Sequence, residues 1–449
     1  MRSSSHRLKA INRASDFEEK TNIAFFLFIL YLVSFFLHLP SRITILGHIR
    51  FDFILVALIS FLIISSNPKE KKHIDNASKY LLAIFCYAII SVPLVEWPGS
   101  VLKSGIVEFI KAAIFYFFTV SLVCNEARFR LVIIVFVVCN FIRVVEPLYL
   151  NITDGYLGGV THLGDGEFAG RLSGAPSDVV NPNGLAFIIA TIFPFMHYVF
   201  AQSSKSAFTI YLILVPILLY TMGLTLSRSG LLALFIIGVG IWAKSIRKIR
   251  LLIFAIIGLI LVGTSLSEIQ KDRYLSIISD DARQSATAEG RIEGWSEDFE
   301  VALNRPIVGH GLGTSREANW NFSGRDQISH ILWAEIWQEI GLIGLTFFLL
   351  YLFAMIKNFR EAGVLIKQHL PPNDFLYRAN EAMQVWLLMN LLFSLASYGL
   401  KSYEWYFFGG LSVVMLKFVK EKVTRENALT AKEDFEVQSD RFKLARRLR

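Results

Sequence analysis

The sequence predicts an all-α fold, that of a polytopic membrane protein, from its composition, its long apolar runs and the charges between them. Of 449 residues, 54% are hydrophobic and only 18% are charged, whereas a soluble domain is about 25% charged. A helix needs about 20 apolar residues to cross the roughly 30 Å hydrocarbon core of a bilayer. A membrane β-barrel would show short alternating segments instead.

About twelve transmembrane helices are predicted, and the first follows a polar, basic tail at residues 1–21. The run 22–39 is long for a signal-peptide core and no small-residue cleavage site follows it, so we expect it to be retained. The predicted spans are 22–39, 51–66, 79–95, 103–123, 129–148, 182–201, 207–225, 228–243, 250–267, 330–356, 381–398 and 402–419.

The loops between these runs alternate in charge. Segments rich in Lys and Arg, such as NPKEKKH, KSIRKIR and the C-terminal RFKLARRLR, fall on one side of the membrane when twelve spans are counted. The positive-inside rule places that side in the cytoplasm, together with the tails 1–21 and 420–449. The net charge of +8 therefore indicates topology, and no nucleic-acid partner is expected.

Two connections on the opposite side are long, and long loops are often functional. The first is an outward loop at 149–181, within a region of about nine spans at 22–266. The second is a large periplasmic loop at 267–329, which precedes the last three spans at 330–419. We therefore expect the chemistry on the periplasmic face of the membrane.

The outward loop ends where a predicted helix begins. In the stretch GRLSGAPSDVVNPNGLAF, Asn181 suits the N-cap and Pro182 the first helical position. Arg171 lies just ahead of this helix start, and free helix N–H groups with a nearby guanidinium favour a phosphate. The plain alternative is that Arg171 forms a surface ion pair with Asp178 or Glu167.

Arg228, in TMGLTLSRSGLLALFII, lies between two apolar runs with almost no loop. An arginine so close to hydrocarbon is costly unless it snorkels or lines a polar cavity. The predicted topology places Arg228 on the outer side, against the usual Lys and Arg bias.

The large loop contains WSEDFEVAL, which predicts a short amphipathic helix with Trp295, Phe299 and Leu303 on one face. The following GHGLG permits a tight turn close to a ligand, and it is not a nucleotide-binding motif because no GK[ST] follows. His310 is either a residue of this turn or a site residue. Arg291 is either an anion contact or the partner of a neighbouring glutamate.

His330 lies where the polar loop becomes a span, in SHILWAEIWQEIGLIGL. Its ordinary pKa near 6.5 suits proton transfer at neutral pH. The alternative is an interfacial histidine bonded to a backbone carbonyl. Trp333 and Trp337 share its helix face, as an interfacial belt or a wall for sugar rings, whereas Glu335 and Glu339 point elsewhere and are poor partners.

Four segments in order, GRLSG…NPNGLA, SRSGLLAL, GRIEGW…RPIVGHGLGT and SHILWAEIWQEIGLIGL, resemble the O-antigen ligase and polymerase superfamily of bacterial envelopes. The resemblance covers about residues 170–350. It implies a C-type glycosyltransferase-like enzyme of the inner membrane that transfers a glycan from undecaprenyl diphosphate, without a metal or cofactor. Ligases use lipid A-core as acceptor, and polymerases use a second carrier-linked glycan. The compact outer loop favours a ligase, and the polymerase remains the alternative.

The same resemblance implies roles for particular residues. Arg171 and Arg228 match the arginines that bind the diphosphate, and His330 matches the essential histidine, which would deprotonate the acceptor hydroxyl. The sequence departs from some members of that family in having Ser329 before the histidine and Ile331 after it, where many members have a small polar residue. Further candidates for substrate contact are Arg291, His310, Asn183 and Trp333. The DD pair at residues 280–281 is interpreted as a solvated turn and not as a metal site.

A second alternative is a transporter or flippase for lipid-linked sugars. Its best support is Lys103, Glu108 and Lys111, which lie within or beside the fourth predicted span. A simple Glu108–Lys111 pair at i, i+3 would explain them without transport, and no internal repeat is visible.

Overall fold

The computed structural model describes residues 2–66, 74–164, 167–245, 248–265, 285–329, 331–395, 397 and 399–447. Each of the twelve predicted spans overlaps a helix in these ranges. The helices are α1 (Arg2–Leu37), α4 (Phe51–Ser65), α5 (Asn76–Ile90), α7 (Ile106–Leu122), α8 (Glu126–Asp154), α9 (Pro182–Phe195), α10 (Lys205–Leu224), α11 (Arg228–Lys244), α12 (Lys248–Ser265), α16 (Leu332–His369), α17 (Phe375–Phe393) and α18 (Tyr403–Arg447).

Among the described residues, six helices are long and apolar enough to cross a membrane: α1 from Glu19, α6 with α7, α8, α9 with η3, α10 and α16. Two shorter apolar helices, α4 and α5, accompany them. This agrees with an all-α polytopic membrane protein, while the count of twelve spans stays a prediction. Short elements between these helices are α2 (Leu39–Arg42), α3 (Thr44–His48), η1 (Val92–Leu94), α6 (Pro98–Ser100), η2 (Val101–Gly105) and η3 (Met196–Phe200).

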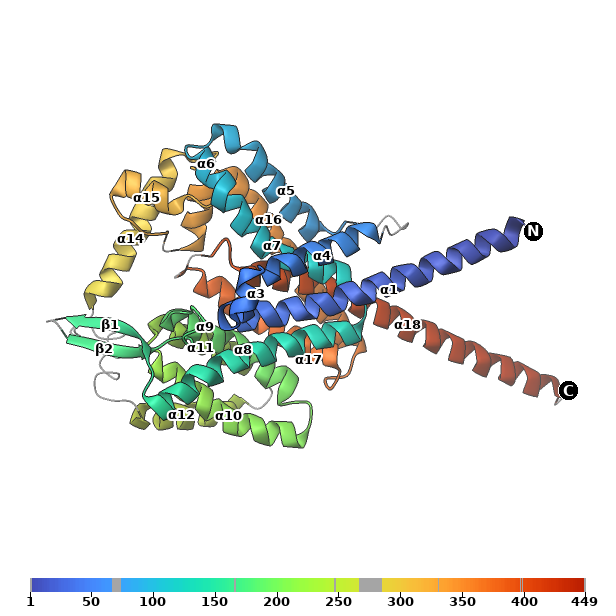
Figure 1. The fold of residues 1–449 in the computed structure, drawn as a ribbon. Helices are drawn as coiled ribbons and strands as arrows, with labels where there is room; N and C mark the ends of the chain where they lie inside the picture. Colours follow the sequence, from blue (N-terminus) through green and yellow to red (C-terminus); the bar gives the residue numbers. More distant parts are fainter. Residues whose placement is uncertain are drawn as a thin grey trace.

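The two chain ends lie on the same side of the helix bundle, where α1 and α18 project from it (Figure 1). The elements of the two long connections lie on the opposite side. They are β1 (Gly158–Gly164) and β2 (Glu167–Leu172) in one part, and α14 (Ser285–Asn304) and α15 (Ser315–Ser323) in another. This arrangement agrees with the predicted parity of spans. We call the side opposite the chain ends the outer side.

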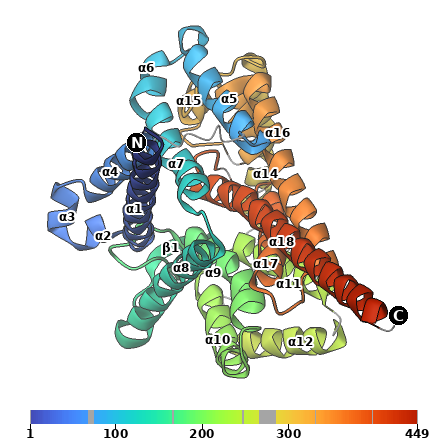
Figure 2. The same ribbon diagram turned by 90° about the vertical axis from the view of Figure 1, so that its right-hand side faces the viewer.

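Figure 2 views the molecule from the side on which both chain ends lie. Aromatic side chains from α1, α8 and α18 contact one another inside the bundle. Phe136 lies 5.4 Å between ring centroids from both Phe36 and Phe407. All three side chains are buried. These large rings are buried away from both lipid and water, and their dense packing stabilises the bundle.

The outward loop at 149–181 contains secondary structure that the sequence analysis did not predict. Helix α8 continues to Asp154 and ends at Gly155, which adopts a left-handed φ of 69° typical of a helix C-cap. An antiparallel hairpin follows, with β1 (Gly158–Gly164) and β2 (Glu167–Leu172). The hairpin packs on the start of α9, since a Cβ at Gly159 would lie 2.7 Å from Cγ of Pro182.

Two helices of the large outer connection are described, α14 (Ser285–Asn304) and α15 (Ser315–Ser323). The helix predicted around WSEDFEVAL is present, but its buried face differs from the predicted one. Phe299 and Leu303 are exposed by 36% and 59%, whereas Asp298, Val301 and Ala302 are buried. The buried face was predicted from the spacing of apolar residues alone, and such a prediction cannot identify a face that contains Asp298.

Helix α16 is kinked at Gly341, whose φ is 63° and whose ψ is −174°. A Cβ at this position would lie 2.1 Å from the carbonyl oxygen of Ile307, so only glycine fits. The N–H of Leu342 donates to the carbonyl of Pro306 at 2.8 Å. The GHGLG turn therefore packs its own backbone against the kink, with Gly309 facing the carbonyl of Glu339.

Candidate functional site

Arg171 is buried, and the hairpin directs its guanidinium towards two helix starts. It pairs across the hairpin with Gly159, on the strand that packs against the start of α9. Its terminal nitrogen donates to Oδ1 of Asn183 at 2.7 Å, and its Nε donates to the carbonyl of Thr225 at 2.8 Å. Arg171 and Asn183, both predicted site residues, therefore lie together.

The turn between α10 and α11, which leads into Arg228, contacts Arg171. Thr225, which accepts from Arg171, is followed by Leu226 in a left-handed conformation with φ 50°. Such a φ is rare for a residue other than glycine and is found at functional sites. Ser227 then caps α11 by accepting from the N–H of Gly230, and Arg228 is the first helical residue. The structure thus holds Arg171 against the turn that leads into Arg228.

Asp178 was one expected partner of Arg171, but its carboxylate binds another arginine. Arg143 of α8 donates from Nε to Oδ2 at 2.6 Å and from its terminal nitrogen to Oδ1 at 3.0 Å. Both residues are nearly inaccessible, and Nδ1 of His38 lies 3.3 Å from the same carboxylate. The side chain of Glu167, the other expected partner, lies outside the described residues.

His330 lies outside the described residues, but residues on both sides of it are fixed. Ser329 is fully buried and its hydroxyl donates to Oδ2 of Asp298 at 2.9 Å. The N–H of Leu332 donates to the carbonyl of Ser397 at 2.9 Å. The chain is therefore anchored to α14 ahead of His330 and to the loop after α17 behind it.

Asp298 belongs to a buried network that joins α14, α15 and α16. Its carboxylate also accepts from Nδ2 of Asn319 at 3.1 Å, and its carbonyl accepts from Nε2 of Gln338 at 2.7 Å. Nε2 of Gln338 donates in addition to Oδ1 of Asn319 at 3.0 Å. A buried network of this kind fixes the relative positions of the three helices.

Glu335 and Glu339, which the helical wheel excluded as partners of His330, are both buried and hold loops in place. Glu335 accepts from the N–H groups of Gly399 and Leu400 at 2.7 and 2.9 Å. Glu339 accepts from the N–H of Gly313 at 2.7 Å. The start of α16 therefore fixes both the GHGLG turn and the segment ahead of α18.

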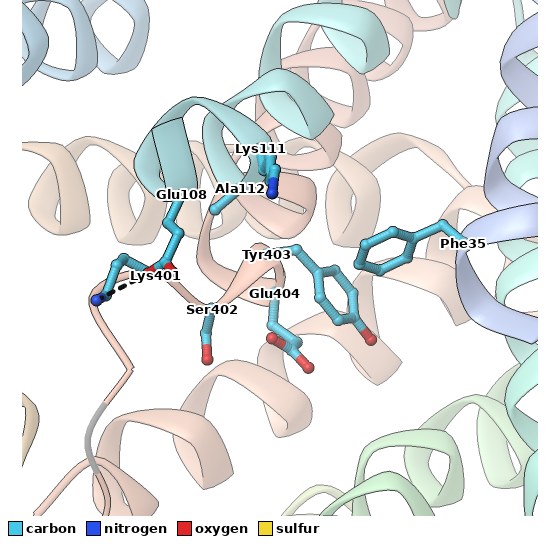
Figure 3. Close-up of a pocket in the computed structure, with 8 residues that line it drawn as sticks. All are labelled: Phe35, Glu108, Lys111, Ala112, Lys401, Ser402, Tyr403 and Glu404. Carbon is cyan, nitrogen blue, oxygen red and sulfur yellow. Dashed lines mark ion pairs between the residues drawn. The ribbon is translucent and has the colours of Figure 1, made fainter. Parts of the chain in front are cut away.

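Glu108 does not form the expected pair with Lys111. Its carboxylate lies 3.1 Å from Nζ of Lys401, the ion pair drawn in Figure 3. Burial lowers the pKa of Lys401, but the negative charge of Glu339 and the hydrogen bond to Glu108 outweigh it, so the pKa is raised. Lys401 is therefore a fixed positive charge between α7 and α16.

His310 lies in the core. It is fully buried, its Nε2 donates to the carbonyl of Val301 at 3.0 Å, and its Nδ1 lies 3.0 Å from the carboxylate of Glu96. The ring stacks on Trp97. These contacts favour the turn residue over the site residue among the two interpretations left open by the sequence.

Of the two remaining predicted residues, the side chain of Trp333 is described and that of Arg291 is not. Trp333 is half-buried in the first turn of α16, and its Nε1 is buried without a hydrogen bond in the described structure. The side chain of Arg291 lies outside the described residues, although the main chain there belongs to α14.

Sequence reasoning missed Arg143, Asp298 and Lys401, and it considered the two glutamates of α16 only as partners of His330. The signal for Arg143 was available, because a charged residue inside an apolar run usually has a partner. Asp298 carried no such signal, since it lies in a polar stretch. Within the described residues no group of three or more His, Cys, Asp or Glu side chains could hold a metal ion.

Comparison with known protein families supports the resemblance seen in the sequence. A family model described as O-antigen ligase matches residues 212–349. The matched stretch runs from α10 into α16 and includes Arg228, Asp298 and Glu339, but it begins after Arg171. No curated protein matches the chain.

Proposed function

We propose that this chain, which a family model described as O-antigen ligase matches over residues 212–349, joins a glycan from undecaprenyl diphosphate to lipid A-core at the periplasmic face of the inner membrane. The family itself implies an enzyme of the glycosyltransferase or ligase type. The carrier, the acceptor and the membrane face are the parts that we propose.

The observation that carries the proposal is the position of Arg171. Its guanidinium contacts Asn183 at the start of α9 and Thr225 in the turn that leads into Arg228 and α11. Helix N-termini and guanidinium groups both favour phosphate. An outer helix end is also where a polyprenyl chain could stay in lipid while its diphosphate is bound.

The chemistry assigns one task to each group. The bond between the anomeric carbon and the diphosphate breaks, and its electron pair leaves with the diphosphate. Arg171 and Arg228 stabilise the charge that grows there, more strongly in the transition state than in the substrate. The acceptor hydroxyl oxygen forms the new bond, and its proton passes to His330.

Fixed neighbours support this role for His330. Because Ser329 is bound by Asp298 and Leu332 by Ser397, the chain is held on both sides of the histidine. A general base must be held within hydrogen-bonding distance of its proton. The reaction as written needs no metal and no nucleotide.

The test is complementation of a deletion strain with wild type, His330→Ala or Arg171→Ala, with envelope glycans separated on a gel. We expect the wild type to restore long glycan on lipid A-core and both variants to fail while present in the membrane. His48→Ala is the matched control, because His48 is exposed and its ring bonds to the carbonyl of Thr44 in its own turn.

Three other outcomes would correct the proposal. Single repeats on the core of the deletion strain would identify a polymerase. Glycan retained on the cytoplasmic leaflet would identify a transporter. Normal long glycan with His330→Ala would remove the histidine from the site.

A further inference from the structure

An open pocket of about 420 Å³ lies at the outer ends of α1, α7 and α18. Its lining residues are Phe35, Glu108, Lys111, Ala112, Lys401, Ser402, Tyr403 and Glu404. Figure 3 shows the Glu108–Lys401 ion pair at one end, Phe35 beside Tyr403 at the other, and Lys111 between them. None of the residues predicted from the sequence to contact substrate lines this pocket.

We propose that this pocket binds the sugar of the acceptor, next to the site that binds the donor diphosphate. The proposal rests on the proposed function, which supplies the need for a second, sugar-bearing substrate. In this proposal the acceptor sugar lies in the pocket, and Lys111 and Glu404 orient it.

The charges of the pocket favour a sugar over a phosphate. Two lysines and two glutamates line it, so groups that donate and groups that accept hydrogen bonds lie side by side. A diphosphate would meet two carboxylates, whereas a sugar hydroxyl both donates and accepts hydrogen bonds and suits a mixture of the two. Ser402 and Tyr403 add hydroxyl groups beside the carboxylate of Glu404.

An aromatic wall closes one side of the pocket. The ring of Phe35 lies 5.2 Å from that of Tyr403 and 4.7 Å from that of Phe115, between centroids. Phe115 is fully buried behind the other two. Such a wall offers an apolar surface to the C–H face of a sugar ring.

Lys111 lacks the partner that a structural lysine would have. It is exposed, and no carboxylate in the described part of the chain forms an ion pair with it. Its neighbour Ile110 is 41% exposed, as expected of a surface that faces lipid. A lysine at this level is costly unless its charge faces a polar cavity, and the pocket provides one.

The pocket adjoins both parts of the proposed site. At one end, Lys401 is within electrostatic reach of Glu339, on the helix that follows His330. At the other end, Glu404 and Tyr403 are within electrostatic reach of Arg143. Arg143 binds Asp178, which belongs to the connection that carries Arg171.

The experiment measures transfer by the full-length protein in nanodiscs, with carrier-linked glycan as donor and lipid A-core from the deletion strain as acceptor. In Lys111→Met we expect the KM for the acceptor to rise about tenfold, which is the usual contribution of a hydrogen bond to a charged group. The KM for the donor should stay within about twofold of wild type. Lys103→Met is the matched control, because Lys103 is exposed on the same helical segment outside the pocket.

A second variant and a second measurement distinguish failure of the pocket proposal from failure of the proposed function. Glu404→Gln should also raise the KM for the acceptor. Because Glu404 is buried, the thermal unfolding midpoint of this variant is first compared with that of wild type. Native mass spectrometry with lipid A-core alone should show an adduct that Lys111→Met loses. An unchanged acceptor KM with a retained adduct overturns the pocket. Absence of transfer by wild type with a Lys111-dependent adduct overturns the proposed reaction and supports the pocket.

Discussion

The two outer connections of this chain are fixed to the helices in contrasting ways. The segment that contains the hairpin is tied to α8 by a buried ion pair, Arg143 with Asp178. The segment with α14 and α15 is bound by a network of hydrogen bonds that centres on Asp298 and includes Ser329. The first connection carries Arg171 and the second leads into His330.

This contrast indicates where each connection is vulnerable. A buried ion pair concentrates its effect in one contact, because removing one partner leaves the other charged and unsolvated. In a network, several hydrogen bonds share the stabilisation. Removing one side chain therefore changes the relative positions of the helices more than it lowers the stability of the protein. We therefore expect stability to depend on the first connection and catalytic geometry on the second.

The largest effect is expected for Asp178→Ala, which leaves Arg143 charged and buried. The loss of stability should be about 3–5 kcal/mol, seen as a fall in the thermal unfolding midpoint in detergent. Arg143→Met with Asp178→Leu removes both charges and should recover much of that loss. Equal midpoints for wild type and the single variant would show that the pair does not hold the hairpin segment.

Ser329→Ala should have a smaller effect on stability and a clearer one on rate. It removes one buried hydrogen bond to a carboxylate, which contributes about 1.5–3 kcal/mol. In the transfer assay we expect kcat to fall by about tenfold or more, with KM for the donor unchanged, because His330 follows directly. Asn319→Ala, at the far side of Asp298, is the comparison: a loss of rate as large as that of Ser329→Ala would contradict a specific role for Ser329.

Asn181→Ala tests the local structure on which Arg171 depends. Asn181 accepts from the N–H of Gly184 at 2.8 Å and caps α9. Loss of such a cap costs about 1 kcal/mol. We expect a small fall in the unfolding midpoint and a modest rise in the KM for the donor, since Asn183 in the same turn binds Arg171. Asn181→Asp keeps the cap and should behave as wild type.

The smallest effect is expected at an exposed pair of the second connection, Arg316 with Asp326. The hydrogen bond from Arg316 holds the pKa of Asp326 below its ordinary value. Any stabilisation from this pair is therefore fully present when the pH is above the ordinary pKa of an aspartate. It is lost as the pH falls through the lowered pKa of Asp326. Both side chains are more than half exposed, and exposed pairs contribute little. Arg316→Ala should leave the unfolding midpoint unchanged at neutral and acidic pH, and a clear fall would show that α15 depends on this pair.

The amino-acid sequence was sufficient to predict a helix at each of the twelve apolar runs, but it did not predict α15. Apolar runs of membrane length indicate helices, and Asn181 with Pro182 predicted the start of α9, because these signals are local. The sequence also indicated Arg171, because it lies just ahead of a predicted helix start, and Arg228, because an arginine beside hydrocarbon requires an explanation. The family match over residues 212–349 agrees with the resemblance and covers three of the four segments that carried it.

Which polar groups meet could be learned from the packing of the helices and not from the sequence. Asp178 binds Arg143 and not Arg171, and Glu108 binds Lys401 and not Lys111. In each case the actual partner lies on another element, so spacing within one helix could not reveal it. The kink at Gly341 likewise depends on the carbonyl of Ile307. Local propensity acts between near neighbours, whereas ion pairs and close backbone contacts are selected by tertiary packing.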